Sequence, residues 1–122
     1  MRAPIPRAVL IVDDDPELLE VLGELLRRHG YATHPAQSGR AALALYPAVE
    51  PALIILDDGL DDMSGSELLR KLRHQNVGAR RPALFLTGAR ANVECLPGDV
   101  VLDKPVDISR LLEVVLSLMP AA

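Results

Sequence analysis

Aromatic residues are almost absent from this chain of 122 residues, which has no tryptophan, two tyrosines and one phenylalanine. Together with a net charge of −4, this scarcity argues against direct nucleic-acid binding, which uses basic and aromatic surfaces. The single cysteine, Cys95, excludes an internal disulfide and suits a reducing cytoplasm. No apolar run approaches the roughly 20 residues that span a bilayer, and no signal peptide is evident. We therefore expect a cytoplasmic protein without a membrane role.

The remaining composition is typical of a globular domain. Hydrophobic residues make up 49% of the chain and charged residues 25%, which excludes a disordered or fibrous protein. A chain of 122 residues has the mass for a single core. We expect residues 1–122 to form one domain, with no separate output domain in this chain.

Five short segments are predicted to form strands. Four of them are continuous apolar runs, which are typical of strands buried on both faces of a sheet. The predicted strands are residues 9–12, 31–34, 52–56, 83–86 and 100–102. Because helical segments separate the strands, the chain is expected to form an α/β fold with a doubly wound, mainly parallel sheet and right-handed crossovers.

The segments that follow the strands contain helix signals. A capping residue precedes apolar residues at helical spacing in four of them. The predicted N-caps are Asp15, Ser38, Ser64 and Asp107. Gly30 is expected to lie just beyond the first helix, and Pro47 is expected to end the second. Residues 88–99 hold glycine and proline but few periodic apolar residues, so the fourth helix is expected to be short or irregular.

Polar residues follow four of the predicted strands. Asp13 and Asp14 follow the first strand, Asp57 the third, Thr87 the fourth, and Lys104, one of only two lysines, the fifth. Ligands of open parallel sheets bind beyond these strand ends, so the side chains are expected to converge. Two carboxylates about 4 Å apart repel by roughly 4 kcal/mol at an effective dielectric constant of about 20, and a divalent cation would relieve this repulsion. Oxygen ligands favour magnesium or calcium over zinc, and a site with few protein ligands favours magnesium.

This set of groups suits phosphoryl transfer. A carboxylate beside a metal ion is a competent nucleophile toward phosphorus, and a metal, an ammonium group and a hydroxyl stabilise the charge on the phosphoryl oxygens. Each residue alone has a commoner structural interpretation. Asp15, directly before Pro16, is interpreted as a helix cap, and Asp58, Asp61 and Asp62 as loop residues. Four matched strand ends in one chain nevertheless favour the chemical interpretation.

The motifs at these strand ends resemble those of the receiver domain of two-component response regulators, of the chemotaxis-regulator type. The resemblance covers essentially the whole chain. It is carried by Leu10-Ile11-Val12-Asp13-Asp14-Asp15, Ile54-Ile55-Leu56-Asp57, Met63-Ser64-Gly65, Leu86-Thr87-Gly88 and Lys104-Pro105. It implies a flavodoxin-like (βα)5 fold with strand order 2-1-3-4-5. It also implies a phosphoacceptor signalling domain that promotes only its own phosphotransfer and dephosphorylation.

The resemblance also implies roles for individual residues. Asp57 would be the phosphoacceptor, with Thr87 and Lys104 stabilising the phosphoryl group. Magnesium would be bound by Asp13, Asp14, Asp57 and the main-chain carbonyl of Gly59. The bond before Pro105 is a candidate cis peptide. The implied partners are a sensor histidine kinase or phosphotransfer protein, an unidentified downstream protein and, in a homodimer, a second copy of the chain.

Three departures from the family pattern concern how phosphorylation would be reported. Asp61 stands where a proline is usual, and Val101 where an aromatic residue is common. Thr87 and Lys104 are 17 positions apart, which is short by about a turn and a half of helix. We therefore expect an ordinary phosphorylation site and an output through a face other than that of the fourth helix.

Two alternative functions remain open. A degenerate receiver would bind a partner without phosphorylation, as Val101 and the short fourth helix allow. A haloacid-dehalogenase-type phosphatase would use Asp13, Asp15, Thr87 and Lys104, but its second acidic pair should follow the lysine, and the chain has no room for a cap. The chain is expected to be a stand-alone receiver or, alternatively, a receiver from a larger protein such as a hybrid kinase.

Overall fold

The computed structural model describes residues 7–75, 81–88 and 93–119. In chain order, the elements are β1 (Ala8–Val12), α1 (Pro16–Arg28), β2 (Ala32–Ala36), α2 (Gly39–Val49), β3 (Leu53–Asp57), α3 (Gly65–Gln75), β4 (Ala83–Thr87), β5 (Val100–Asp103) and α4 (Ile108–Leu118). Within these ranges no helix has the length and apolar character needed to cross a membrane.

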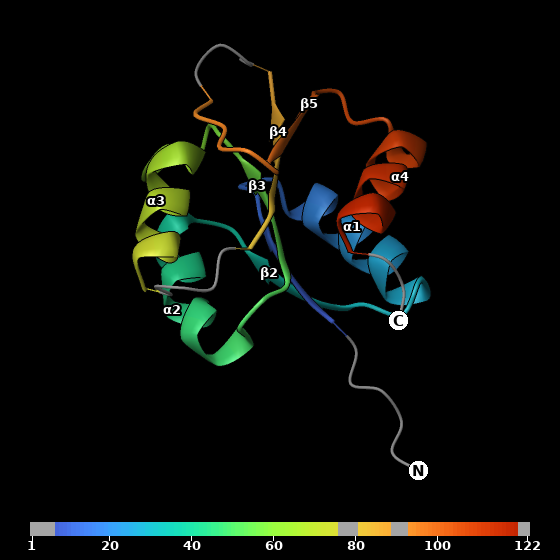
Figure 1. Cartoon of the computed structure of the whole chain (residues 1–122), viewed down its shortest axis with the longest axis horizontal. Helices are drawn as coiled ribbons and strands as arrows, with labels where there is room; N and C mark the ends of the chain where they lie inside the picture. Colours follow the sequence, from blue (N-terminus) through green and yellow to red (C-terminus); the bar gives the residue numbers. More distant parts are fainter. Residues whose placement is uncertain (1–6, 76–80, 89–92, 120–122) are drawn as a thin grey trace.

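The strands form one parallel sheet in the order β2-β1-β3-β4-β5. Helices α1 and α4 cover one face, and α2 and α3 cover the other (Figure 1). The predicted fold class and strand order are therefore confirmed. The second strand lies slightly later than predicted, because the main-chain N–H of Tyr31 donates to the carbonyl of Leu26 in α1 at 3.1 Å. The Tyr31 hydroxyl donates to the carbonyl of Met119 at 2.7 Å.

Two apolar layers enclose the central strands. On β1, Val9 and Ile11 face α1 and α4, whereas Leu10 and Val12 face α2 and α3. All four are at most 1% exposed. A strand covered on both faces needs apolar residues at consecutive positions, and this explains why the predicted strands show no polar alternation.

The predicted helix caps are present. The side chains of Asp15, Ser38, Ser64 and Asp107 each accept a hydrogen bond from a main-chain N–H in the first turn that follows. The prediction that Pro47 ends the second helix is wrong, because α2 continues to Val49. In the last turn the missing N–H of Pro47 removes a single intrahelical hydrogen bond, which the helix tolerates. The helix is instead capped by Glu50, which follows Val49 in the left-handed conformation with φ of 47°.

The connection between β4 and β5 differs from the other crossovers. Its described part, residues 93–99, contains no helix and turns at Gly98, where φ is +95°. This agrees with the prediction of a short or irregular helix between the fourth and fifth strands, and residues 89–92 lie outside the described ranges. The segment lies against α3, to which polar side chains attach it.

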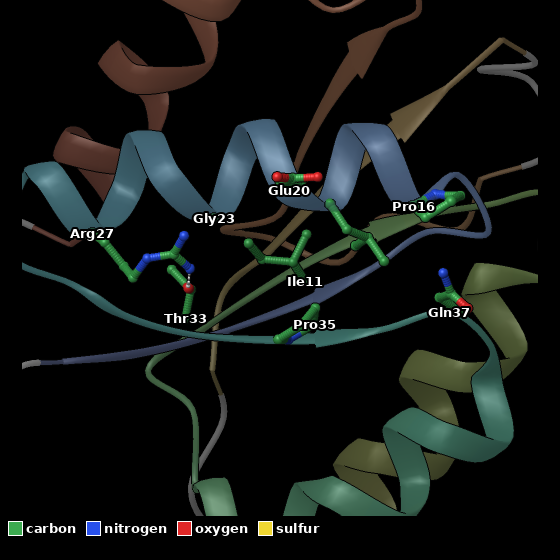
Figure 2. A pocket seen from close by; sticks show the side chains of 9 residues that line it. Ile11, Pro16, Glu20, Gly23, Arg27, Thr33, Pro35 and Gln37 are labelled. Atoms are coloured by element: carbon green, nitrogen blue, oxygen red, sulfur yellow. Dashed lines mark hydrogen bonds between the residues drawn. The ribbon is translucent and has the colours of Figure 1, made fainter.

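A groove of about 390 Å³ runs between α1 and the edge strand β2 (Figure 2). The buried side chains of Ile11 and Leu19 line it, and Arg27 crosses one end to donate a hydrogen bond to the Thr33 hydroxyl at 2.9 Å. Pro35 has no N–H to offer on the free edge of β2, so it discourages the addition of another strand. The groove is on the α1 side of the sheet, opposite α3.

Candidate functional site

Three carboxylates meet at the carboxyl edge of the sheet. Neighbouring strands β1 and β3 pair Val12 with Leu56, so the residues that follow each of them emerge at the same level. One oxygen from each of Asp13, Asp14 and Asp57 lies within 4.8 Å of the others. Asp13 and Asp57 are buried, at 1% and 8% exposure, whereas Asp14 is exposed. The predicted convergence is therefore present in the fold.

Lys104 follows the edge strand β5 and reaches this acidic cluster with its side chain. Its Nζ lies 2.9 Å from Asp13 Oδ2 and 3.3 Å from Asp57 Oδ2. The main-chain N–H of Lys104 donates to the carbonyl of Thr87 at 2.9 Å, which fixes the start of the loop after β5. The bond between Lys104 and Pro105 is cis, as expected.

The charge of Lys104 is fixed by its neighbours. Burial lowers the pKa of this ammonium group, but the hydrogen bond and charge of Asp13, with the weaker contribution of Asp57, raise it above its ordinary value. Because the pKa of the folded state is raised, the stabilisation is complete below the unfolded value of about 10.4 and is lost only as the pH rises through the folded value. Lys104 is therefore a cation throughout the neutral range.

Hydrogen bonds orient the two buried carboxylates. Asp13 Oδ1 accepts the N–H of Asp15 at 2.9 Å, and its other oxygen contacts Lys104. Asp57 Oδ1 accepts the N–H of Gly59 at 3.1 Å. The side chains are held in place by the turns that follow β1 and β3, and each keeps further lone pairs for another ligand.

A cavity of about 540 Å³ opens beside Asp57. Thr87 lines the same cavity from the end of β4, together with Gly59 and Gly88. Asp57 pairs with Leu86 in the sheet, so Thr87 lies one residue further along the neighbouring strand. The cavity brings a carboxylate and a hydroxyl together around a space large enough for a phosphoryl group, while glycines leave it open.

Two aspartates of the β3–α3 loop have specific contacts that the sequence did not indicate. Asp58 is only 7% exposed, and its Oδ1 accepts the N–H and the hydroxyl of Ser66, both at 3.2 Å. Asp62 accepts the N–H groups of Gly39 and Arg40 at 2.9 Å, and these two hydrogen bonds lower the pKa of its carboxyl. Both are loop residues, as predicted, but one anchors α3 and the other caps α2 from a distant part of the chain.

Gly65 allows α3 to begin directly against the end of β3. A Cβ atom at this position would lie 2.5 Å from the carbonyl oxygen of Asp57 and 2.9 Å from the Cα of Asp58. Both contacts are with main-chain atoms, which cannot rotate away as a side chain would. The glycine in the Met63-Ser64-Gly65 motif is therefore required by close packing behind Asp57.

We predict that Gly65→Ala destabilises the domain by roughly 1–3 kcal/mol, since the added methyl group forces α3 away from β3. Urea denaturation measures the change in the free energy of unfolding. Gly88→Ala is the matched control, because a Cβ there would meet no atom of the described residues within 4 Å. A Gly65→Ala variant as stable as the control would contradict the packing argument.

Sequence comparison identifies the family. Residues 9–116 match the family model of the response regulator receiver domain. The chain is 38% identical over 112 residues to the probable transcriptional regulatory protein TcrX of Mycobacterium tuberculosis, covering 88% of this chain and 47% of TcrX. It is 33% identical over 119 residues to the C4-dicarboxylate transport transcriptional regulatory protein DctR of Rhodobacter capsulatus, covering 93% of this chain and 60% of DctR. The chain thus spans about half the length of these relatives.

Solved structures support the same assignment. A CheY-like receiver domain from Methylobacillus flagellatus superposes with a TM-score of 0.82 at 26% identity, covering 93% of this chain and 99% of that one. The response regulator TrrA of Thermotoga maritima, solved in complex with Mg²⁺ and beryllofluoride, gives a TM-score of 0.80 at 28% identity, with coverage of 93% and 99%. The family assignment excludes the haloacid-dehalogenase alternative. The chain belongs to the receiver-domain family of two-component response regulators.

Proposed function

We propose that Asp57 accepts a phosphoryl group in a magnesium-dependent reaction, with a sensor histidine kinase or a phosphotransfer protein as the donor. The observation that carries the proposal is the convergence of Asp13, Asp14 and Asp57 with Lys104 and Thr87 at one edge of the sheet. A module that only bound a partner would have no need for three clustered carboxylates, two of them paired with one half-buried lysine.

The donor set suits Mg²⁺. The carboxylate oxygens lie within one coordination sphere of one another, and the exposed Asp14 leaves one side open to water. The ion would be held by Asp13, Asp14, Asp57 and the main-chain carbonyl of Gly59. When bound, it supplies positive charge that neutralises phosphoryl oxygens and fixes their position.

Asp57, Thr87 and Lys104 have separate roles in the transfer of the phosphoryl group. The Asp57 oxygen attacks phosphorus, and the bond from phosphorus to the donor's nitrogen breaks as the new bond forms. The Thr87 hydroxyl donates to a phosphoryl oxygen, and the Lys104 ammonium moves its contact from the Asp57 carboxylate to the new charge. Lys104 already contacts Asp13, which keeps it in position throughout.

The proposed role is that of a signalling domain that acts through protein contacts. TcrX is a probable transcriptional regulatory protein and DctR a transcriptional regulatory protein, but this chain covers only part of each, so their output is not carried over. We propose that residues 1–122 receive the phosphoryl group and report it to a separate protein partner, without binding nucleic acid directly.

The test uses the purified chain with acetyl phosphate and Mg²⁺. Intact-mass measurement is expected to find one added phosphoryl group that disappears when EDTA replaces the metal. Beryllofluoride with Mg²⁺, a mimic of the phosphoryl group, is expected to shift the amide signals of Gly59 and Thr87. The absence of both the adduct and the metal-dependent shifts would refute the proposal.

A further inference from the structure

Asp58 is a buried carboxylate that lines the cavity beside Asp57 but has no role in the proposed phosphoryl transfer. It follows Asp57 directly, and its Oδ1 accepts the N–H and hydroxyl of Ser66. The hydroxyl of Ser66, itself 7% exposed, also accepts the N–H of Glu94 at 3.1 Å. A continuous set of hydrogen bonds therefore connects the residue after Asp57 with the irregular segment between β4 and β5.

The other end of that segment is attached to the same helix. Arg73 of α3 forms a bidentate ion pair with Asp99, with nitrogen–oxygen distances of 2.6 and 3.0 Å. Asp99 also accepts the N–H of Leu96 at 3.1 Å, which closes the turn before β5. Residues 93–99 are thus fastened to α3 at Glu94 and at Asp99, with Leu96 between the two attachments.

A groove of about 410 Å³ lies between α3 and this segment. Leu69 is at its floor and Leu96, which is 51% exposed, forms part of its wall. Arg70 and Glu94 face each other across it at 3.8 Å, and both side chains are 66% exposed. An ion pair of this length and exposure contributes little stability, so another carboxylate can replace Glu94 at low cost.

The charge of this side of the molecule indicates what the groove binds. The net charge of the chain is −4, yet residues 70–75 at the end of α3 contain no acidic residue. Within α3, Arg70, Lys71 and Arg73 all follow its single acidic residue, Glu67. Asp99 already neutralises Arg73, which leaves Arg70 as the cation beside the exposed Leu96. Arg70, whose ion pair with Glu94 is long and exposed, therefore offers an exchangeable positive charge next to an apolar contact, which suits an acidic peptide with an apolar anchor.

We propose that this α3 groove is the docking surface for the downstream protein partner. The partner places an apolar side chain between Leu69 and Leu96, and one of its carboxylates takes the place of Glu94 beside Arg70. The regulation of this surface rests on the proposed phosphorylation of Asp57. Phosphorylation replaces the single negative charge of the Asp57 carboxylate with about −1.5 to −2 charges next to Asp58, and the added repulsion alters the hydrogen bonds through Ser66 that hold Glu94 over the groove.

The surface is tested with a blocked synthetic peptide that has one leucine between two pairs of glutamates. We expect the peptide to shift the amide signals of Ser66, Arg70 and Leu96, and the Arg70→Glu variant to weaken binding at least about tenfold. Arg27→Glu is the matched control, because Arg27 is also exposed and lines a groove, but on the opposite face of the sheet. The inference is overturned if both variants bind equally, if alanine replaces the leucine without loss, or if oligothymidylate of equal charge binds the groove as well as the peptide.

The regulation is tested by forming the beryllofluoride complex with Mg²⁺ and repeating the peptide titration. We expect tighter binding than in the unmodified protein, and we expect Ser66→Ala to remove this difference while the complex at Asp57 still forms. If no complex forms, the proposed phosphorylation fails, and the titration of the unmodified protein still decides the docking surface. If the complex forms but peptide affinity is unchanged, or changes equally in Ser66→Ala, the proposed coupling is wrong.

Discussion

The Asp57→Asn variant is expected to form no phosphoryl adduct with acetyl phosphate and Mg²⁺ under conditions that label the unmodified chain fully. An amide oxygen lacks the negative charge that makes the Asp57 carboxylate a nucleophile. The substitution also removes one of the three charges that favour the metal. The readout is intact mass after a timed incubation, with the modified peptide located by fragmentation.

The expected loss of the phosphoryl adduct reports the missing nucleophile and not unfolding, because the variant should fold normally. Asparagine has the size of aspartate, and its side-chain oxygen can still accept the N–H of Gly59. Lys104 keeps its hydrogen bond of 2.9 Å with Asp13. Urea denaturation is expected to give a free energy of unfolding close to that of the unmodified chain.

Asp58→Asn is the matched control, since it removes a second buried carboxylate from the adjacent position. Asp58 contacts Ser66 and lies outside the cluster formed with Asp13 and Asp14, so its variant is expected to keep full labelling. Full labelling of Asp57→Asn would move the acceptor to another residue. Loss of labelling in both variants would point to a general disturbance of the loop.

The acidic cluster was predictable because its signals are local. Each aspartate follows a short, partly β-branched apolar run, which favours a buried strand, and the parallel sheet then brings the strand ends together. Thr87 and Lys104 were predicted in the same way, because Thr87 ends β4 and Lys104 directly follows β5. A site built from consecutive strand ends needs no knowledge of side-chain packing.

The contacts that escaped prediction join distant parts of the chain. Asp62 caps a helix that begins 23 residues earlier, and Asp99 pairs with an arginine 26 residues earlier. Neither spacing carries a helical or strand period, so only the folded chain identifies the partners. The prediction for Pro47 was wrong for a different reason. The stability that a proline costs a helix depends on its position, and the sequence did not show that Pro47 lies in the last turn of α2.

Breaking the ion pair between Arg73 and Asp99 is expected to cause the largest loss of stability, because the pair is buried. The side chain of Asp99 is fully buried and that of Arg73 is 16% exposed. The Asp99→Ala variant leaves a buried guanidinium without its carboxylate and removes the acceptor of two main-chain N–H groups, those of Ala83 and Leu96. Removing one partner of a buried pair costs about 3–5 kcal/mol, which urea denaturation resolves easily.

Glu24→Ala is the control for burial, because the Glu24–Arg28 pair has the same distance of 2.6 Å but side chains that are 57% and 73% exposed. Its loss is expected to cost about 0.3–0.5 kcal/mol. Similar losses in the two variants would show that burial does not decide the strength of these pairs.

The pH dependence of the free energy of unfolding separates the contribution of the Asp99 charge from that of its packing. Burial raises the pKa of this carboxyl, but the hydrogen bond and charge of Arg73 and the N–H groups of Leu96 and Ala83 together lower it. A lowered folded-state pKa means that the stabilisation is present above the unfolded value of about 3.9 and is lost as the pH falls through the folded value. The stability difference between the unmodified chain and Asp99→Ala should therefore narrow below about pH 4. A stability difference that stays constant from neutral to acid pH would assign the lost stability to the cavity left by the side chain. Packing, and not this ion pair, would then hold residues 93–99 between β4 and β5 in place.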